Sequence, residues 1–76
     1  MKPTKVRIQS LVQPYVQEDE QGKYLSFSDA ELLIDQILKE YEGITCRYNT
    51  YYPGCEELLI TSIRGTTEFF SVRIKK

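Results

Sequence analysis

The stretch ITCRYNTYYPGCEELLITSI (residues 44–63) sets a Pro-Gly pair between two runs that are rich in β-branched and aromatic residues. Such runs around a short turn signal are typical of a β-hairpin. With Pro53-Gly54 at the turn, the expected register pairs Tyr52 with Cys55, Tyr48 with Leu59, Cys46 with Thr61 and Ile44 with Ile63. The last three pairs form one mostly apolar face, which is expected to pack on a core. Because Pro-Gly prefers a type II turn, a loop wider than two residues is the alternative.

A third strand is expected after a second turn signal at Gly65-Thr66. In that register Thr61 faces Phe70 and Leu59 faces Val72, which extends the apolar face. A slip of one residue in either register would exchange the two faces of the sheet, because side chains alternate between faces along a strand.

A helix is expected immediately before the hairpin, over residues 29–42. The segment SFSDAELLIDQILKEYEG (residues 26–43) offers Ser28 as N-cap with Glu31 three residues later, which is a capping box. Gly43 fits the left-handed position that follows a helix. Apolar residues recur at the spacing of one buried helical face, namely Ala30, Leu33, Ile34, Ile37, Leu38 and Tyr41.

The N-terminal part is expected to supply two more strands. KVRIQSLV (residues 5–12) alternates apolar and polar residues, and Lys23–Phe27 is a short run that follows the polar turn EDEQG. The expected fold is therefore a single α+β domain over residues 1–76. It has two layers in the order ββαβββ, with one helix packed on a mostly antiparallel sheet of four to five strands.

The sheet face away from the helix is the main functional clue. In the expected register it carries apolar and aromatic side chains bordered by arginines, a composition typical of contact surfaces. The candidate partner-binding residues are Arg47, Tyr51, Tyr52, Leu58, Ile60, Phe69 and Arg73. Two alternatives stay open: the N-terminal hairpin covers this face, or the tyrosines are there only because aromatic residues suit strands.

Composition argues against catalysis, a cofactor and a metal site. The 76 residues include no histidine and two cysteines, too few ligands for a structural zinc site within one chain. The four glycines fall at turns or a helix end and form no phosphate-binding loop. An internal disulfide is excluded in the expected register, because the steps from Cys46 to Tyr52 alone span roughly 20 Å. We therefore expect a protein that is not an enzyme.

The expected function is that of a small protein-binding module, a regulator or inhibitor that occupies a surface of a larger protein. The alternative is a single-stranded nucleic-acid-binding domain with a basic and aromatic face, although the isoelectric point of about 5.4 argues against it. The residues of this alternative are Lys5, Arg7, Arg47, Phe69, Arg73 and Lys75.

Three further expectations concern the setting of the protein. A cytoplasmic location without membrane association follows from the lack of an apolar leader segment or long apolar run. A homodimer is a further possibility, because so short a chain is marginally stable by itself and self-association commonly stabilises such chains. The segment EDEQGKYLSFSDAELLID (residues 18–35) resembles strand-into-helix segments of small phage and prophage accessory proteins, which implies a protein encoded by a phage or mobile element.

Overall fold

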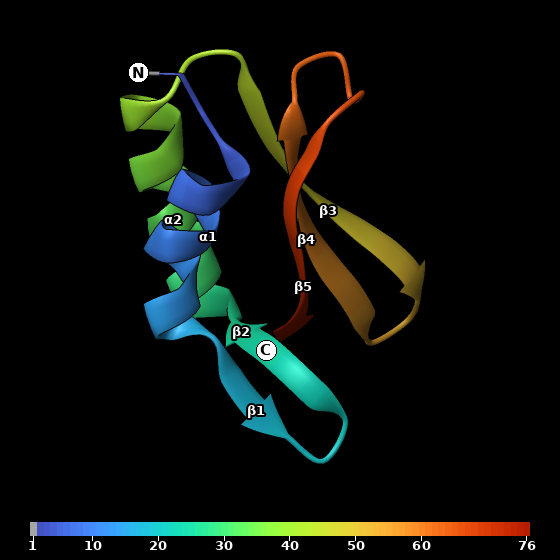
Figure 1. Ribbon diagram of the computed structural model, residues 1–76. Coiled ribbons are helices and arrows are strands. Elements are labelled where there is room, and N and C mark those ends of the chain that lie inside the picture. Colours follow the sequence, from blue (N-terminus) through green and yellow to red (C-terminus); the bar gives the residue numbers. More distant parts are fainter. Residues whose placement is uncertain (1) are drawn as a thin grey trace.

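Two α-helices cover one face of a five-stranded sheet in the computed structural model, which describes residues 2–76 (Figure 1). The elements in chain order are α1 (Lys5–Val12), the 3₁₀ turn η1 (Gln13–Tyr15), β1 (Gln17–Asp19), β2 (Gly22–Ser26), α2 (Phe27–Glu40), β3 (Ile44–Tyr52), β4 (Cys55–Ser62) and β5 (Glu68–Lys75). The α+β class, the two layers and the mostly antiparallel sheet agree with the expectation. The order of elements differs, because the segment of the first expected strand forms an additional helix, and residues 17–19, which overlap the expected polar turn, form the first strand instead.

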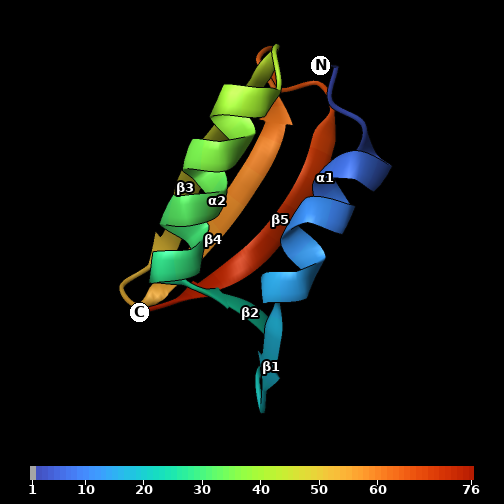
Figure 2. The ribbon, with the colours of Figure 1, turned by 90° about the vertical axis from the view of Figure 1, so that its left-hand side faces the viewer.

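The strands lie in the order β1-β2-β5-β4-β3. Only the β2–β5 pair is parallel, and the other three pairs are antiparallel. The two edges of the sheet are therefore β1 and β3. Figure 2 shows α2 over the β3–β4 side of the sheet and α1 beside β5, so the opposite face of the sheet carries no helix.

The expectation of a strand over residues 5–12 is wrong, because this segment forms α1. The Thr4 side chain caps the helix by accepting a hydrogen bond from the backbone N–H of Arg7 at 3.2 Å. Ile8 and Val12, one helical turn apart, are completely buried in the core. The segment fits both an alternating and a helical pattern, and packing of Ile8 and Val12 selects the helix.

The one expected helix, over residues 29–42, is confirmed as α2, but it begins two residues earlier than predicted and ends at Glu40. Ser26 is the N-cap in place of Ser28, and its hydroxyl accepts from the backbone N–H of Asp29 at 3.2 Å. The inward residues Ala30, Leu33 and Ile37 are buried as expected. Leu38 is not, because half of its surface stays exposed.

The hairpin register is shifted by one residue from the prediction. Tyr52 does pair with Cys55, but a β-bulge lies between Thr50 and Tyr52, and beyond it Tyr48 pairs with Leu58. A bulge adds one residue to one strand only, so every later partner on β4 moves by one. The two faces of β4 are thereby exchanged.

This shift corrects the assignment of Leu58 and Ile60 to the outer face. Both side chains are 0% exposed and belong to the core beneath the helices. Phe69 is also buried, at 8% exposed, because a second bulge adds it opposite the Ile60–Thr61 step. The core comprises Ile8, Val12, Leu25, Ala30, Leu33, Ile37, Ile44, Leu58, Ile60, Phe69, Val72 and Ile74.

Candidate protein-binding surface

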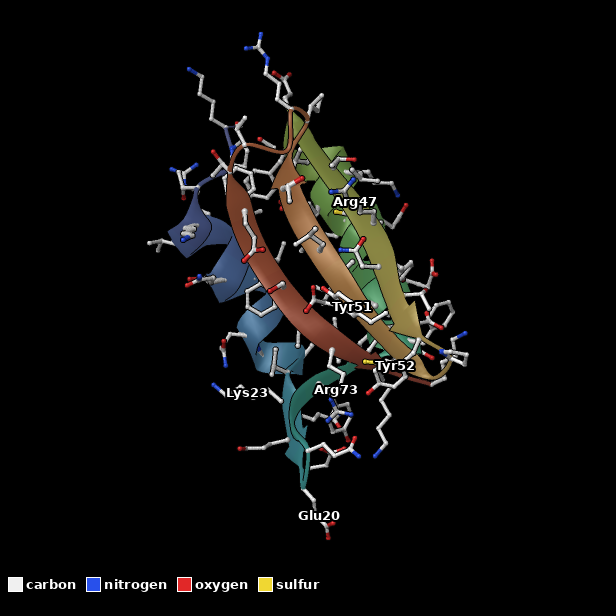
Figure 3. All side chains as sticks on the ribbon, turned by 90° about the vertical axis from the view of Figure 1, so that its right-hand side faces the viewer. Glu20, Lys23, Arg47, Tyr51, Tyr52 and Arg73 are labelled. Atoms are coloured by element: carbon white, nitrogen blue, oxygen red, sulfur yellow. The ribbon has the colours of Figure 1, made fainter. Side chains whose placement is uncertain are left out.

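The helix-free face of the β3–β4 hairpin carries exposed and half-buried residues that the register leaves outside the core. Arg47 pairs with Leu59, Asn49 with Glu57 and Tyr52 with Cys55. Residues that are directly opposite share a face. Figure 3 looks onto this face and shows Arg47, Tyr51 and Tyr52 along it. We call the set Arg47, Asn49, Tyr51, Tyr52, Glu57 and Leu59 the hairpin surface.

The bulge explains why two consecutive tyrosines lie together. In a regular strand Tyr51 and Tyr52 would point to opposite faces. Here Tyr51 is the unpaired residue of the bulge, and Tyr52 shares the outer face with its partner Cys55. Their side chains are 63% and 65% exposed, so the end of the hairpin presents two aromatic rings to its surroundings.

Hydrogen bonds hold these phenols in place and raise their pKa values. The Tyr51 hydroxyl donates to Oε1 of Glu57 at 3.0 Å, and this bond raises the pKa of Tyr51. A hydrogen bond with the side chain of Cys55 raises the pKa of Tyr52. A neutral tyrosine combines an apolar ring with a polar tip, which is the property that enriches tyrosine at protein interfaces.

Arg73 lies on the same side of the sheet, but its contacts are with other residues of the domain. Its Nη2 is 2.6 Å from Oδ1 of Asp19 and 3.2 Å from the carbonyl oxygen of Gly22. Lys75 Nζ lies 3.2 Å from the other carboxylate oxygen of Asp19. Both cations lie over the ring of Tyr24, at 5.4 Å and 5.0 Å from its centroid. The cluster fastens the β1–β2 turn to β5.

The charge of Asp19 reflects this cluster. Removal from water acts to raise the pKa of its carboxyl, but the backbone N–H of Gln21 and the side chains of Lys75 and Arg73 together hold that pKa below its usual value. Asp19 is therefore an anion at neutral pH, and Arg73 is already paired rather than available to a partner.

A cavity of about 360 Å³ adjoins this cluster, lined by Gln21, Gly54, Glu56, Arg73, Ile74, Lys75 and Lys76. Its cations face carboxylates, since Lys76 Nζ lies 3.2 Å from Oε1 of Glu56 and the other two pair with Asp19. The cavity therefore offers little uncompensated charge to an anion.

The structure does not bring the candidate nucleic-acid residues together. Lys5 and Arg7 lie on α1, which covers the face opposite Arg47. Phe69 is buried, so its ring cannot stack on a base. Of the candidate protein-binding residues, Arg47, Tyr51 and Tyr52 share the helix-free face, whereas Leu58, Ile60 and Phe69 are in the core.

Two members of the hairpin surface were missed by sequence reasoning, namely Glu57 and Leu59, whereas Asn49 was expected on this face. A register centred on a regular two-residue turn places Leu59 on the inner face. The residues next to Leu59 in the sequence are also aliphatic, so they do not contradict this placement. The type II preference of Pro53-Gly54 is the one signal of an irregular hairpin end, and the irregularity takes the form of a bulge beside the turn and not of a wider loop.

Both cysteines are unbridged, and they differ in surroundings. Cys46 is on the inner side of β3, where burial raises the pKa of its thiol to about 11.

Within residues 2–76, no three His, Cys, Asp or Glu side chains are grouped to hold a metal ion. Over the same residues, no helix is long and apolar enough to cross a membrane.

Comparison with known proteins identified no similar protein. No protein-family model, curated protein or solved structure matches the chain.

Proposed function

We propose that this chain is a protein-binding module, a regulator or inhibitor that occupies part of a larger protein through the hairpin surface. The observation that carries the proposal is the pair of exposed tyrosines that the bulge sets on one face of the sheet, the face that also carries Arg47 and Leu59. Tyrosine and arginine are the residues that most often dominate interface energetics.

The hairpin surface also defines the chemistry of the partner. We expect the partner to present a carboxylate that pairs with Arg47. Its surface should also have apolar recesses with a polar rim that accommodate the rings of Tyr51 and Tyr52. Glu57 is occupied by the Tyr51 hydroxyl, which orients that ring before any partner arrives. Such pre-organisation lowers the entropic cost of binding.

The expected result for a variant that lacks both rings, Tyr51→Ala with Tyr52→Ala, is a loss of affinity. Proteins captured with the tagged wild-type chain are purified, and each affinity is measured by calorimetry. The double variant should bind a true partner at least about 30-fold more weakly, because aromatic anchors carry much of the binding energy. The matched control is Tyr15→Ala, which removes an exposed ring from η1 and should change affinity less than about threefold.

Two results would count against the proposal. One is that every captured protein binds the double variant as tightly as the wild type. The other is that a labelled single-stranded oligonucleotide binds with an affinity that falls steeply with salt and depends on Arg47, which would favour the nucleic-acid function instead.

A further inference from the structure

The edge strand β3 is unusual in its length and lack of charge. It has nine residues, of which Arg47 alone is charged. The opposite edge, β1, has three residues and includes Glu18 and Asp19. Native sheets commonly protect edges by keeping them short or charged, because an unpaired edge recruits another strand. The β1 edge is protected in this way and the β3 edge is not.

The register shows which backbone groups point outward from β3. The N–H of Ile63 donates to the carbonyl oxygen of Gly43 at 3.1 Å, so these residues form a hydrogen-bonded pair. Such pairs alternate along an antiparallel ladder, so Thr45, Arg47 and Asn49 bond to β4. The backbone groups of the alternate residues point to the free edge, and these residues are Ile44, Cys46, Tyr48 and Thr50.

These outward groups lack partners in the chain itself. Within residues 2–76, the hydrogen bonds made outside helices and ladders do not use the backbone of those four residues. Four consecutive outward positions offer both donors and acceptors over most of the strand. The β3 edge is therefore a complete template for one more antiparallel strand.

The neighbouring side of α2 carries both acidic and apolar side chains. The hydroxyl of Tyr48 donates to Oε1 of Glu31 at 3.3 Å, which shows that this side of α2 faces β3. Leu38 lies two turns further along on the same side and is 51% exposed, with the half-buried Ile34 between them. An exposed apolar side chain thus lies on the side of the helix nearest the unpaired edge.

We propose that two copies of this chain form a symmetric dimer by antiparallel pairing of their β3 strands. The two-fold axis passes between the two Tyr48 residues. This register sets Arg47 of each copy opposite Asn49 of the other. Centring the axis on Arg47 would instead set two arginines opposite each other, which is unfavourable.

A second copy fits this edge better than an unrelated peptide does. A peptide strand would satisfy the backbone of β3 alone. The two-fold axis brings the Leu38 side of one α2 toward the same side of the other, because an isologous interface repeats each patch. The pairing also stops at two copies, because it uses the β3 edge of both. The edges that remain free are the short, acidic β1 strands, and the bulge at Thr50–Tyr52 interrupts the rest of β3.

The dimer would be one continuous sheet of ten strands, five from each copy, with all helices on one face. The hairpin surfaces of the two copies would then be neighbours on the other face. The interface uses the β3 edge and α2, so the inference does not depend on the partner-binding role of Tyr51 and Tyr52.

The first test is the native mass by light scattering, with Thr50→Pro and Thr50→Ala as matched variants. Proline removes an outward N–H and leaves the β3–β4 ladder intact, since the Thr50 N–H points away from β4. The wild type and Thr50→Ala should be dimers. Thr50→Pro should dissociate with a dissociation constant about tenfold or more higher, because both copies lose a bond. A monomeric wild type, or a Thr50→Pro variant that folds and dimerises unchanged, would overturn the inference.

A second test fixes the register and holds even if the proline variant fails to fold. In a background with Cys46→Ala and Cys55→Ser, Tyr48→Cys places one thiol next to its symmetry mate, at a Cα separation of about 5.5 Å. Mild oxidation should link these chains into a covalent dimer. The matched Arg47→Cys variant should remain unlinked, since its symmetry mate lies diagonally, about 7–8 Å away. Equal linking of both variants, or of neither, would contradict the proposed pairing, and the same assay leaves Tyr51 and Tyr52 untouched.

Discussion

Tyr48 illustrates how a single residue connects the edge strand to the helix layer. Its ring lies 5.8 Å from that of Phe27, and its hydroxyl donates to Glu31. Burial, followed by the negative charge of Glu31, raises the pKa of the phenol to about 12. Ionisation in the folded protein is therefore harder than in the unfolded chain, where the pKa is about 10.

This difference predicts how Tyr48 contributes to stability at alkaline pH. A raised pKa gives a contribution that is complete below about pH 10 and is lost as the pH rises toward 12. The Tyr48→Phe variant cannot ionise there, so the midpoint of its urea unfolding should fall less between pH 9 and 11.5 than that of the wild type. Tyr15→Phe, at an exposed site, is the control and should follow the wild type. An identical pH dependence for Tyr48→Phe would show that its ionisation is not linked to unfolding.

At the scale of the element, β4 shows what a one-residue shift does to a strand. Leu58 and Ile60 lie under the helices, and Leu59 between them lies on the helix-free face. All three residues are aliphatic, so their types do not distinguish the two faces. The bulge in β3 makes that distinction by setting which residue of β4 faces Tyr48.

The exchange of faces predicts unequal costs for two similar truncations in β4. Ile60→Ala should lower the free energy of unfolding by about 2–5 kcal/mol, since it leaves a cavity in the core. Leu59→Ala should cost less than Ile60→Ala, because Leu59 is only partly buried and lies on the helix-free face outside the core. Urea unfolding followed by circular dichroism measures both. Equal costs, or a larger cost for Leu59→Ala, would contradict the register.

At the scale of the whole molecule, one carboxylate ties together segments that are far apart in the chain. Asp19 accepts from Arg73 and Lys75, more than fifty residues away, and thereby fastens the β1–β2 hairpin to β5. The hairpin projects from the sheet in both views (Figures 1 and 2), and its other links to the domain are the β2–β5 ladder, the buried Leu25 and the further hydrogen bonds of Arg73. The link therefore contributes to the stability of the β1–β2 end of the domain.

The lowered pKa of Asp19 gives this link a pH dependence with a definite sign. The stabilisation is present above the ordinary carboxyl pKa of about 3.9 and is lost as the pH falls through the lower folded value. Asp19→Asn should lower the urea midpoint at pH 6, and its difference from the wild type should shrink by pH 2.5. Glu20→Gln, an exposed neighbour in the same turn, should have little effect at either pH. A difference that persists at pH 2.5 would mean that charge is not the basis of the link.

Local signals determined part of this fold. The helix α2 could be predicted because its apolar period is a local signal. Its two ends were predicted less well, because Ser26 and not Ser28 is the N-cap, and the helix ends at Glu40 with the extended Tyr41 as C-cap, so the left-handed Gly43 (φ +73°) lies beyond the helix end. The Pro53-Gly54 turn and its Tyr52–Cys55 pair could be predicted for the same reason. The tyrosines of the hairpin surface were found because they are close to that turn.

Tertiary structure alone decided the rest. The segment Lys5–Val12 satisfies both a strand and a helix pattern, and only the burial of Ile8 and Val12 against the sheet distinguishes them. The register of β4 depends on a bulge whose position follows from packing of Leu58 and Ile60 in a core built by distant segments. A strand alternates faces at every residue, so a non-local shift of one position moved Leu58 and Ile60 inward and brought Tyr52 beside Tyr51.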